Sequence, residues 1–548
     1  MKKLKLPIFA ALVLALGACG NQSRTNGSDS AEIHASASDA VAATSAGKVA
    51  GYVQNGINIF KGIPYAKAER FQAPQAPDSW EGVRSCRSFG PTSPQAERAG
   101  WQNDEIAFAF DWDDGYTGED CQRLNIWTPA IADGKKRPVM VWLHGGGFAA
   151  GSGQELPGYD GANLAKDGDA VVVTLNHRLN VLGFLDLSEF GEKYAKSGNA
   201  GLLDLVAALR WVKDNIANFG GDPDNVTIFG QSGGGGKVTT LLGTPSADGL
   251  FHKAIVQSGS MLRMMNAENS RRIGRAAVEE LGLNPADISA IDTIPYERLL
   301  AAGEKAIAKV KAELADNTGG TFIFGWAPTV DGDVLPSHPF EPEAPAQSKE
   351  VPMMIGTTLH EFTASTYVPA LKEMPKEKII ENLKQRYGEN TEDFLTAFEK
   401  AFPGYQPIDL IDTDFTFRPG AVEQGNLKSA VEGAAPVYMY MFAWESPVMD
   451  GRLRSTHCME IPFVFNNTDR HASMTGGGED ARKLGKIMSE AWLNFARTGK
   501  PAAEGMPEWP AYTAENGATM WFDNNCHVTN HHDKELLDIV HRAPVRGF

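Results

Sequence analysis

The sequence predicts an α/β fold with a central, mostly parallel sheet, helices on both faces and helical insertions above the sheet. Continuous apolar runs, such as residues 139–143 and 170–175, are typical of strands that are buried on both faces. Stretches with helical spacing, such as residues 202–219, separate these runs, and such alternation indicates strands joined by helical crossovers. Charged amphipathic helices are expected at 266–315 and 369–402, where they would form the insertions.

Length and composition favour a large globular chain. It has 548 residues, of which 42% are hydrophobic, so it can bury a sizeable core, and length alone would suggest several domains. The formal net charge is −17, and no basic run offsets it. Such a surface repels nucleic acid, so we expect no nucleic-acid partner.

The first 18 residues have the pattern of a signal peptide. Three lysines precede a short apolar stretch at residues 7–16, which is too short to span a membrane. The sequence Leu-Gly-Ala-Cys at 16–19 resembles a bacterial lipobox and predicts lipidation of Cys19, although an ordinary secretory signal with Cys19 incidental is the alternative. Several acyl chains would anchor the chain stably. Because Gly20 follows the cysteine, we expect export to the cell envelope and the outer membrane.

Residues 19–46 are predicted to be a disordered tether. They are rich in Ser, Ala, Asn, Thr and Asp and have almost no large apolar residue. Strand-like alternation begins at residues 47–53, and residues 57–60 would continue it as a hairpin partner. The folded domain is therefore expected to cover residues 47–548.

Cysteines suggest one disulfide. An exported chain can hold disulfides, and Cys86 and Cys121 are the closest pair in sequence apart from Cys19. A bridge between them would close a loop of about 35 residues and stabilise the fold by roughly 3–4 kcal/mol in the chain-entropy model. The sequence leaves open whether Cys458 and Cys526 pair or stay free.

The most informative motif is Gly-Gln-Ser-Gly-Gly at residues 230–234. A β-branched and aromatic run, residues 226–229, precedes it, and residues 235–242 can form a helix. A strand, a Gly-x-Ser-x-Gly turn and a helix together form a nucleophile elbow, which would expose Ser232 Oγ at the end of a sheet. Taken by itself, the motif could also be a plain glycine-rich loop.

A serine nucleophile needs backbone donors for the oxyanion that develops on the substrate. His-Gly-Gly-Gly-Phe at residues 144–148 follows a predicted strand, and its glycines leave backbone N–H groups free to point into a site. This loop pairs with the N–H of the residue after the nucleophile, which is Gly233. A phosphate-binding loop is the alternative, but no Gly-Lys-Ser/Thr follows.

The serine also needs a base to accept its proton. His457 lies in a loop after the predicted strand at residues 437–442, which is a suitable place for a base that must reach the elbow. His144 and His360 are the main rivals, because they border the site in the sequence.

An acid should lie between serine and histidine if the chain order is Ser, Asp or Glu, His. Glu361 follows the predicted strand at residues 351–355 and would orient the imidazole of His457. Asp331 and Asp333 are the alternatives, although their surroundings favour a turn.

With these motifs in place, the chain resembles the type-B carboxylesterases, an α/β-hydrolase family that includes the cholinesterases. The resemblance runs from about Tyr52 to Phe522. Besides the elbow, the matching blocks are residues 60–66, 119–125, 176–179, 198–204, 215–223, 257–259 and 492–496.

The resemblance implies one catalytic domain around a single α/β-hydrolase sheet, with the helical insertions above the active site. It selects Glu361 and His457 from the candidates, needs no metal and no cofactor, and implies that Ser258 supports the acid. It also assigns the oxyanion donors to the N–H groups of Gly146, Gly147 and Gly233.

Other matched positions resemble structural ion pairs, Arg70 with Glu119 and Arg178 with Asp204. The chain also departs from the family pattern, which usually has Glu before the serine and Ala after it, a Tyr at 177, and Leu and Tyr at 122 and 123. The departures are Gln231, Gly233, His177, Gln122 and Arg123. None of them removes a catalytic group.

These observations predict a lipid-anchored serine carboxylesterase that acts on a small-molecule carboxylic ester. The alternatives are an adhesion or binding relative that has no activity, and a lipase or polyester hydrolase. Substrate choice would depend on the insertions and on the aromatic residues of the loop between Cys86 and Cys121, which are Trp101, Phe108, Phe110 and Trp112. The oligomeric state does not follow from the sequence.

Overall fold

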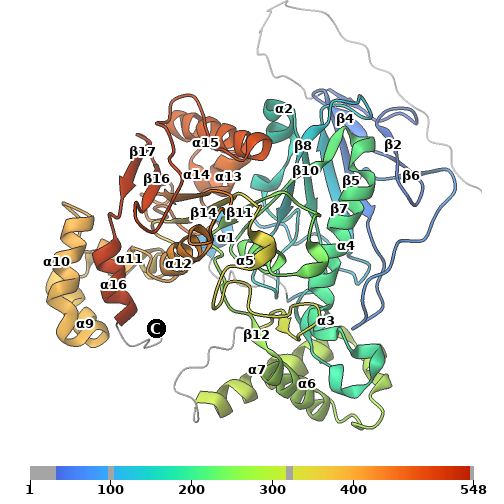
Figure 1. Ribbon diagram of the computed structural model, residues 1–548, viewed down its shortest axis with the longest axis horizontal. Coiled ribbons are helices and arrows are strands. Elements are labelled where there is room, and N and C mark those ends of the chain that lie inside the picture. The colour runs from blue at the N-terminus through green and yellow to red at the C-terminus, as the bar shows by residue number, and fades with distance from the viewer. Residues whose placement is uncertain (1–31, 97–103, 316–324, 543–548) are drawn as a thin grey trace, which may run out of the picture.

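A twelve-stranded sheet forms the centre of the molecule (Figure 1). The computed structural model describes residues 32–96, 104–315 and 325–542. From one edge to the other, the strands are β1 (Ile33–His34), β4 (Tyr52–Gln54), β5 (Ile57–Pro64), β7 (Arg123–Thr128), β9 (Val171–Leu175), β8 (Arg137–Leu143), β10 (Gly221–Gln231), β11 (Lys253–Gln257), β14 (Met353–Thr358), β15 (Val437–Phe442), β16 (Ala518–Phe522) and β17 (His527–Asn530). Neighbouring strands from β9 to β16 run parallel, and both edges are antiparallel. The predicted fold class is therefore confirmed.

Two smaller sheets accompany the main one. They contain β2 (Val41–Ala43), β3 (Lys48–Ala50) and β6 (Val83–Ser85) in the first, and β12 (Met265–Asn266) and β13 (Thr329–Val330) in the second. Strands β1 and β2 lie within residues 19–46, so the predicted tether is too long at its C-terminal end. The reason is backbone pairing: Val41 pairs with Ala50, and Ala42 is buried. The signal peptide, Cys19 and residues 20–31 lie outside the described residues.

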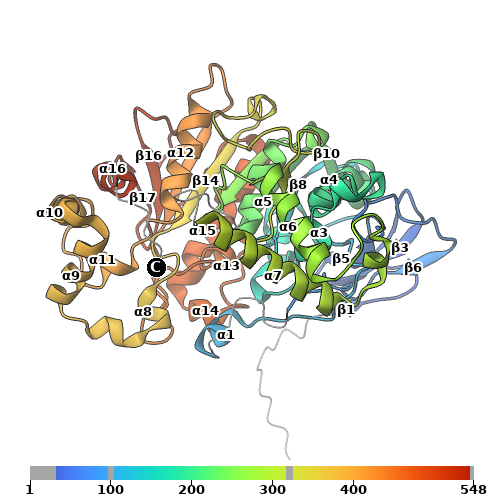
Figure 2. The ribbon, with the colours of Figure 1, turned by 90° about the horizontal axis from the view of Figure 1, so that it is seen from below.

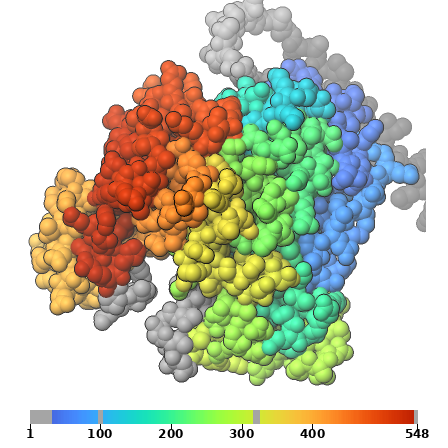
Figure 3. All heavy atoms as spheres, viewed as in Figure 1, coloured from blue at the N-terminus to red at the C-terminus, as the bar shows by residue number. Residues whose placement is uncertain are grey.

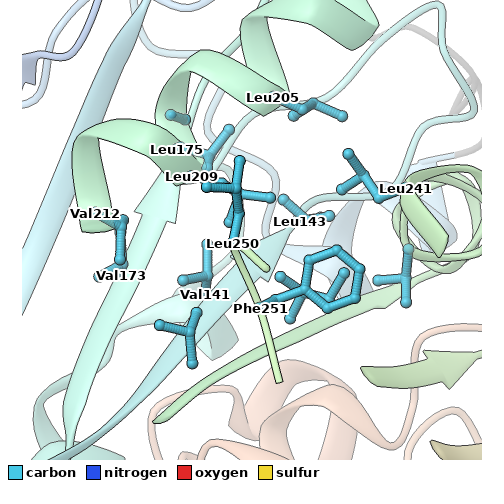
Figure 4. Packing of buried hydrophobic residues seen from close by; sticks show 14 of the residues in the cluster. Val141, Leu143, Val173, Leu175, Leu205, Leu209, Val212, Leu241, Leu250 and Phe251 are labelled. Carbon is cyan, nitrogen blue, oxygen red and sulfur yellow. The ribbon is translucent and has the colours of Figure 1, made fainter. Parts of the chain in front are cut away.

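Helices cover both faces of the sheet. Strand side chains alternate between the two faces, so the apolar strands place apolar residues on both, and each face needs a cover. Val141 and Leu143 of β8 belong to a core cluster on one face (Figure 4), and Met140 and Trp142 belong to a second cluster on the other. The first face is covered by α4 (Ala200–Asn215), α5 (Gly233–Leu242) and α12 (Arg418–Ser429). The second is covered by α2 (Ala162–Gly168), α13 (Ile461–Val464) and α15 (Glu479–Thr498).

The predicted helical insertions are present, and Figure 3 shows them as two separate projections from the body. In the view of Figure 2, α9 and α10 also lie apart from α6 and α7. One contains α6 (Ala267–Glu280) and α7 (Tyr296–Ala315), which pack with α3 (Asn180–Phe184). The other contains α9 (Lys376–Tyr387), α10 (Thr391–Ala401), α11 (Asp409–Asp412) and α16 (Lys534–Arg542). The remaining helices are α1 (Asp104–Phe110), α8 (Ala364–Tyr367) and α14 (Ala472–Thr475). Of the helices in the described ranges, none is both long and apolar enough to cross a membrane.

Candidate active site

Ser232 lies in a strained turn between β10 and α5. Its backbone has φ 57° and ψ −125°, a conformation that L-residues adopt only where the surroundings enforce it. The Ser232 N–H donates to Gln257 O on β11 at 2.8 Å. A Cβ on Gly234 would lie 1.9 Å from Leu143 O, so only glycine allows β8 to approach this closely. The strand, turn and helix predicted around Ser232 are thus present.

His457 and Glu361 lie side by side on loops that follow β15 and β14. The Nδ1 of His457 is 2.5 Å from Glu361 Oε2, and the backbone N–H of His457 donates to Glu361 O at 2.6 Å. The Thr358 N–H donates to the other carboxylate oxygen at 2.9 Å, and both side chains are buried. This arrangement fixes the imidazole with its proton on Nδ1, so Nε2 is the basic atom.

The rival residues have other partners. His360 Nδ1 lies 2.8 Å from Ser455 Oγ, and His144 Nδ1 lies 2.9 Å from Gly145 O. Asp331 accepts hydrogen bonds from two backbone N–H groups of its own turn and from Asn199 Nδ2, and Asp333 pairs with Lys196 at 3.3 Å. The two aspartates therefore belong to a turn, as their sequence suggests.

Ser232 is partly exposed, and within the described ranges its Oγ is not hydrogen-bonded to His457. Instead, the Nε2 of Gln231 lies 3.3 Å from Nδ1 and 3.2 Å from Nε2 of the imidazole. The Cys458 thiol donates to Gln231 Oε1 at 3.0 Å, which orients the amide. Phe362 stacks on the imidazole ring, with the centroids 4.5 Å apart. Catalytic hydrogen bonds are often long before substrate binds, so this geometry is compatible with a base beside a nucleophile.

The glycines of the 144–148 loop follow β8 and turn sharply towards the elbow. Gly146 and Gly147 have φ values of 77° and 62°. A Cβ on Gly233 would lie 2.4 Å from Gly147 N and Gly147 Cα, so the loop backbone rests directly on the residue after the nucleophile. Of the three predicted donors, Gly147 therefore lies against Gly233, the residue that follows Ser232.

Further carboxyl groups lie behind the His457–Glu361 pair, and the sequence reasoning missed them. Glu460 accepts from Gln257 Nε2 at 3.2 Å, and burial together with the charge of Glu361 raises the pKa of Glu460 to about 7. Asp414 accepts backbone N–H groups at the start of α12, and burial and Glu361 raise its pKa as well. The sequence does contain a signal for Glu460, because it is the single charged residue in the apolar run after His457.

Ser258 lies at the end of β11, where its N–H donates to Gly356 O at 2.8 Å. In the part of the chain that the structure describes, its buried Oγ has no hydrogen-bond partner, so it is not joined to Glu361 as the resemblance implied. No group of three or more His, Cys, Asp or Glu side chains within the described ranges could hold a metal ion.

The predicted disulfide between Cys86 and Cys121 is wrong. Both are free, buried thiols, and burial raises the pKa of Cys86 to about 11 and that of Cys121 to about 12. Cys86 packs in the core with Val49 and Phe60, and Cys121 is 0% exposed. Cys458 and Cys526 are also free.

The predicted ion pairs form, but only one is buried. Arg178 Nη2 lies 2.7 Å from Asp204 Oδ1 with both side chains enclosed, whereas the Glu119 side chain beside Arg70 is 42% exposed. Among the aromatic residues of the loop before Cys121, Phe110 is buried and Phe108 is exposed, and Trp101 lies outside the described residues.

A cavity of about 830 Å³ lies next to Phe362, and Ser232 and His457 are not among the described residues that line it. Its wall is mostly apolar and includes Phe362, which covers the imidazole. Other lining residues are Leu371, Ile379, Leu383, Ile411 and Phe415. Such a space suits an apolar ligand group.

Several known proteins are similar to this chain over most of its length. Residues 38–540 match the model of the carboxylesterase family. The para-nitrobenzyl esterase of Bacillus subtilis is 35% identical over 512 residues, which cover 90% of this chain and 97% of that protein. Phenmedipham hydrolase of Pseudarthrobacter oxydans is 33% identical, with 88% and 94% coverage.

Two solved structures are similar over nearly their whole length. An esterase from anaerobic Clostridium hathewayi, which can hydrolyse aliphatic aromatic polyesters, has a TM-score of 0.83 and 40% identity, covering 94% of this chain and 100% of that one. A carboxylesterase of Geobacillus stearothermophilus has a TM-score of 0.74 and 37% identity, with 91% and 99% coverage.

Proposed function

The chain belongs to the carboxylesterase family and is a carboxylic ester hydrolase, and on that premise we propose that it is a serine esterase with Ser232, His457 and Glu361 as its triad. The observation that carries the proposal is the hydrogen bond between buried His457 and Glu361, next to a serine held in a strained elbow. The substrate class is a small-molecule carboxylic ester.

In the proposed acylation, Ser232 Oγ attacks the ester carbonyl carbon while its proton passes to His457 Nε2. The carbonyl electrons move to oxygen, and the N–H groups of Gly146, Gly147 and Gly233 bind the resulting oxyanion. Glu361 stabilises the imidazolium and keeps Nδ1 protonated. When the intermediate collapses, the bond to the alcohol oxygen breaks and His457 gives that oxygen its proton, which leaves an acyl group on Ser232.

Deacylation repeats these steps with water. His457 Nε2 takes a proton from a water molecule whose oxygen attacks the acyl carbon, and the same N–H groups bind the second oxyanion. Collapse breaks the bond to Ser232 Oγ, which recovers its proton from His457. The products are a carboxylic acid and the free enzyme.

The test is the Ser232→Ala variant, assayed with p-nitrophenyl acetate. We expect kcat to fall at least about 1,000-fold, because the nucleophile and its base act as a unit. Ser246→Ala, a Ser-to-Ala exchange whose hydroxyl has no described partner, is the control and should keep its activity. Wild-type turnover by Ser232→Ala would refute the assignment. An inactive wild-type protein that a fluorophosphonate does not label would favour an adhesion or binding role instead.

A second candidate, a polyester hydrolase, has specific support. Large apolar side chains are exposed beside the site, with Phe362 and Val368 50% and Tyr367 40% accessible. A polymer chain or an apolar surface could rest on them. The 40% identical esterase from Clostridium hathewayi acts on aliphatic aromatic polyesters. The ratio of rates on a polyester film and on a soluble short-chain ester would distinguish the two candidates.

A further inference from the structure

Lys237 is a fully buried lysine in the helix that follows the nucleophile. It lies on α5, five residues after Ser232, and its exposed fraction is 0%. Burying an ammonium group is unfavourable unless hydrogen bonds or an opposite charge compensate. Burial lowers the pKa of Lys237 to about 7, and the charge of Glu155 opposes this effect. Because burying Lys237 is so unfavourable, we expect a specific contact that compensates for it.

That contact is with the loop that carries the proposed oxyanion donors. Lys237 Nζ donates to His144 O at 2.8 Å and to Gly145 O at 3.4 Å. It also lies 5.9 Å from the centre of the Phe148 ring, at the other end of the loop. One ammonium group therefore contacts the beginning and the end of residues 144–148.

Peptide geometry links this contact to the proposed oxyanion hole. A trans peptide is planar, so the carbonyl of Gly145 and the N–H of Gly146 point in opposite directions. The Gly145 carbonyl has two donors, Lys237 Nζ and His144 Nδ1, the latter at 2.9 Å. Burial lowers the pKa of His144, which keeps its ring neutral with the proton on Nδ1. Holding the carbonyl of Gly145 therefore also holds the direction of the N–H of Gly146.

We propose that Lys237 is a positioning residue for the reaction: its ammonium group holds the carbonyl of Gly145 so that the N–H of Gly146 stays directed at the substrate oxyanion. The proposal rests on the proposed serine esterase function. With a pKa of about 7, Lys237 is an ammonium group in part of the molecules, and both its ammonium form and its amine form can donate to the carbonyl of Gly145.

The test compares two buried lysines. Lys237→Met keeps most of the volume and removes the donors. Lys428→Met is the matched control, because Lys428 is equally buried and its Nζ donates to Ser348 O and to Lys349 O, before β14 begins. The proposed catalytic residues follow the C-terminal ends of the strands. Lys428 contacts the backbone before a strand begins, so it lies at the opposite end of the sheet.

For Lys237→Met we expect kcat on p-nitrophenyl acetate to fall about 100-fold, as on loss of one oxyanion donor, with KM within about threefold of wild type. The inhibition constant of a trifluoromethyl ketone, which mimics the tetrahedral intermediate, should rise by a similar factor. Lys428→Met should lower the melting temperature but leave kcat and the inhibition constant unchanged.

Folded Lys237→Met with wild-type kcat and inhibitor affinity would overturn the inference. If that variant does not fold, Lys237→Gln, whose uncharged side chain is one bond shorter, takes its place, and wild-type kcat and inhibitor affinity there would overturn the inference equally. An active Ser232→Ala variant would refute the esterase mechanism itself, so the two failures are distinguishable.

Discussion

Gly233 should be intolerant of the residue that the family usually carries at its position, alanine. A Cβ built on Gly233 would lie 2.2 Å from Gly147 O, and 2.4 Å from both its N and its Cα. Ordinary contacts begin at 3.4 Å, so the backbone of one partner must move by about 1 Å. A misplacement of about 1 Å at a reacting centre can lower the rate about 100-fold. For Gly233→Ala we therefore expect kcat to fall by that factor.

The assay is kcat and KM on p-nitrophenyl acetate, together with trifluoromethyl ketone inhibition. Gly236→Ala is the matched control on the same helix, because its Cβ would meet Met261 Sδ at 2.5 Å, the far part of a flexible side chain that can move aside. That exchange should leave kcat near wild type. Because alanine has the higher helix propensity, it should also stabilise the helix by about 1 kcal/mol. Wild-type kcat and inhibitor affinity in Gly233→Ala would refute the reasoning.

Two further predictions concern stability. Asp204→Asn strands the buried charge of Arg178 and should lower the free energy of unfolding by about 3–5 kcal/mol in urea titrations; a change below about 1 kcal/mol would contradict it. At Asp533, burial tends to raise the pKa, but the charges of Arg418 and His532 and the hydrogen bonds to the carboxylate together outweigh it and lower the pKa to about 2. This depressed pKa adds stability above pH 3.8, on the order of 2 kcal/mol, that is lost as the pH falls towards about 2. In the Asp533→Asn variant, the free energy of unfolding should depend less on pH between about 2 and 3.8 than in the wild type. The same pH dependence in both proteins would refute the assignment.

The sheet and the order of the site residues could be predicted because they leave local signals. Buried parallel strands need continuous apolar runs, and β8, β9 and β11 have them. The elbow needs glycines at fixed spacing, which the motif around Ser232 provides. Strands β1 and β2 give no such signal, since they are short and held by backbone pairing.

Contacts between distant segments could not be predicted, because neither spacing nor composition encodes them. The prediction of a Cys86–Cys121 bridge was wrong for this reason: closeness in sequence says nothing about where the fold places each thiol, and both are free and buried. The contact of Gln231 with His457 spans 226 residues, and that of Lys237 with His144 spans 93. A lysine after a glycine run looks like a solvated helix residue until the fold encloses it.

Gly233 and Lys237 are best understood as two parts of one support. Residues four apart on a helix lie on the same face, so both meet the loop that packs against that side of α5. Gly233 lets the backbone of Gly147 approach, and Lys237 holds the carbonyls of His144 and Gly145. The loop is thus fixed near both ends by the helix that carries the nucleophile. Any movement of α5 would then carry Ser232 and the proposed oxyanion donors together, so their relative geometry does not depend on how the rest of the sheet adjusts.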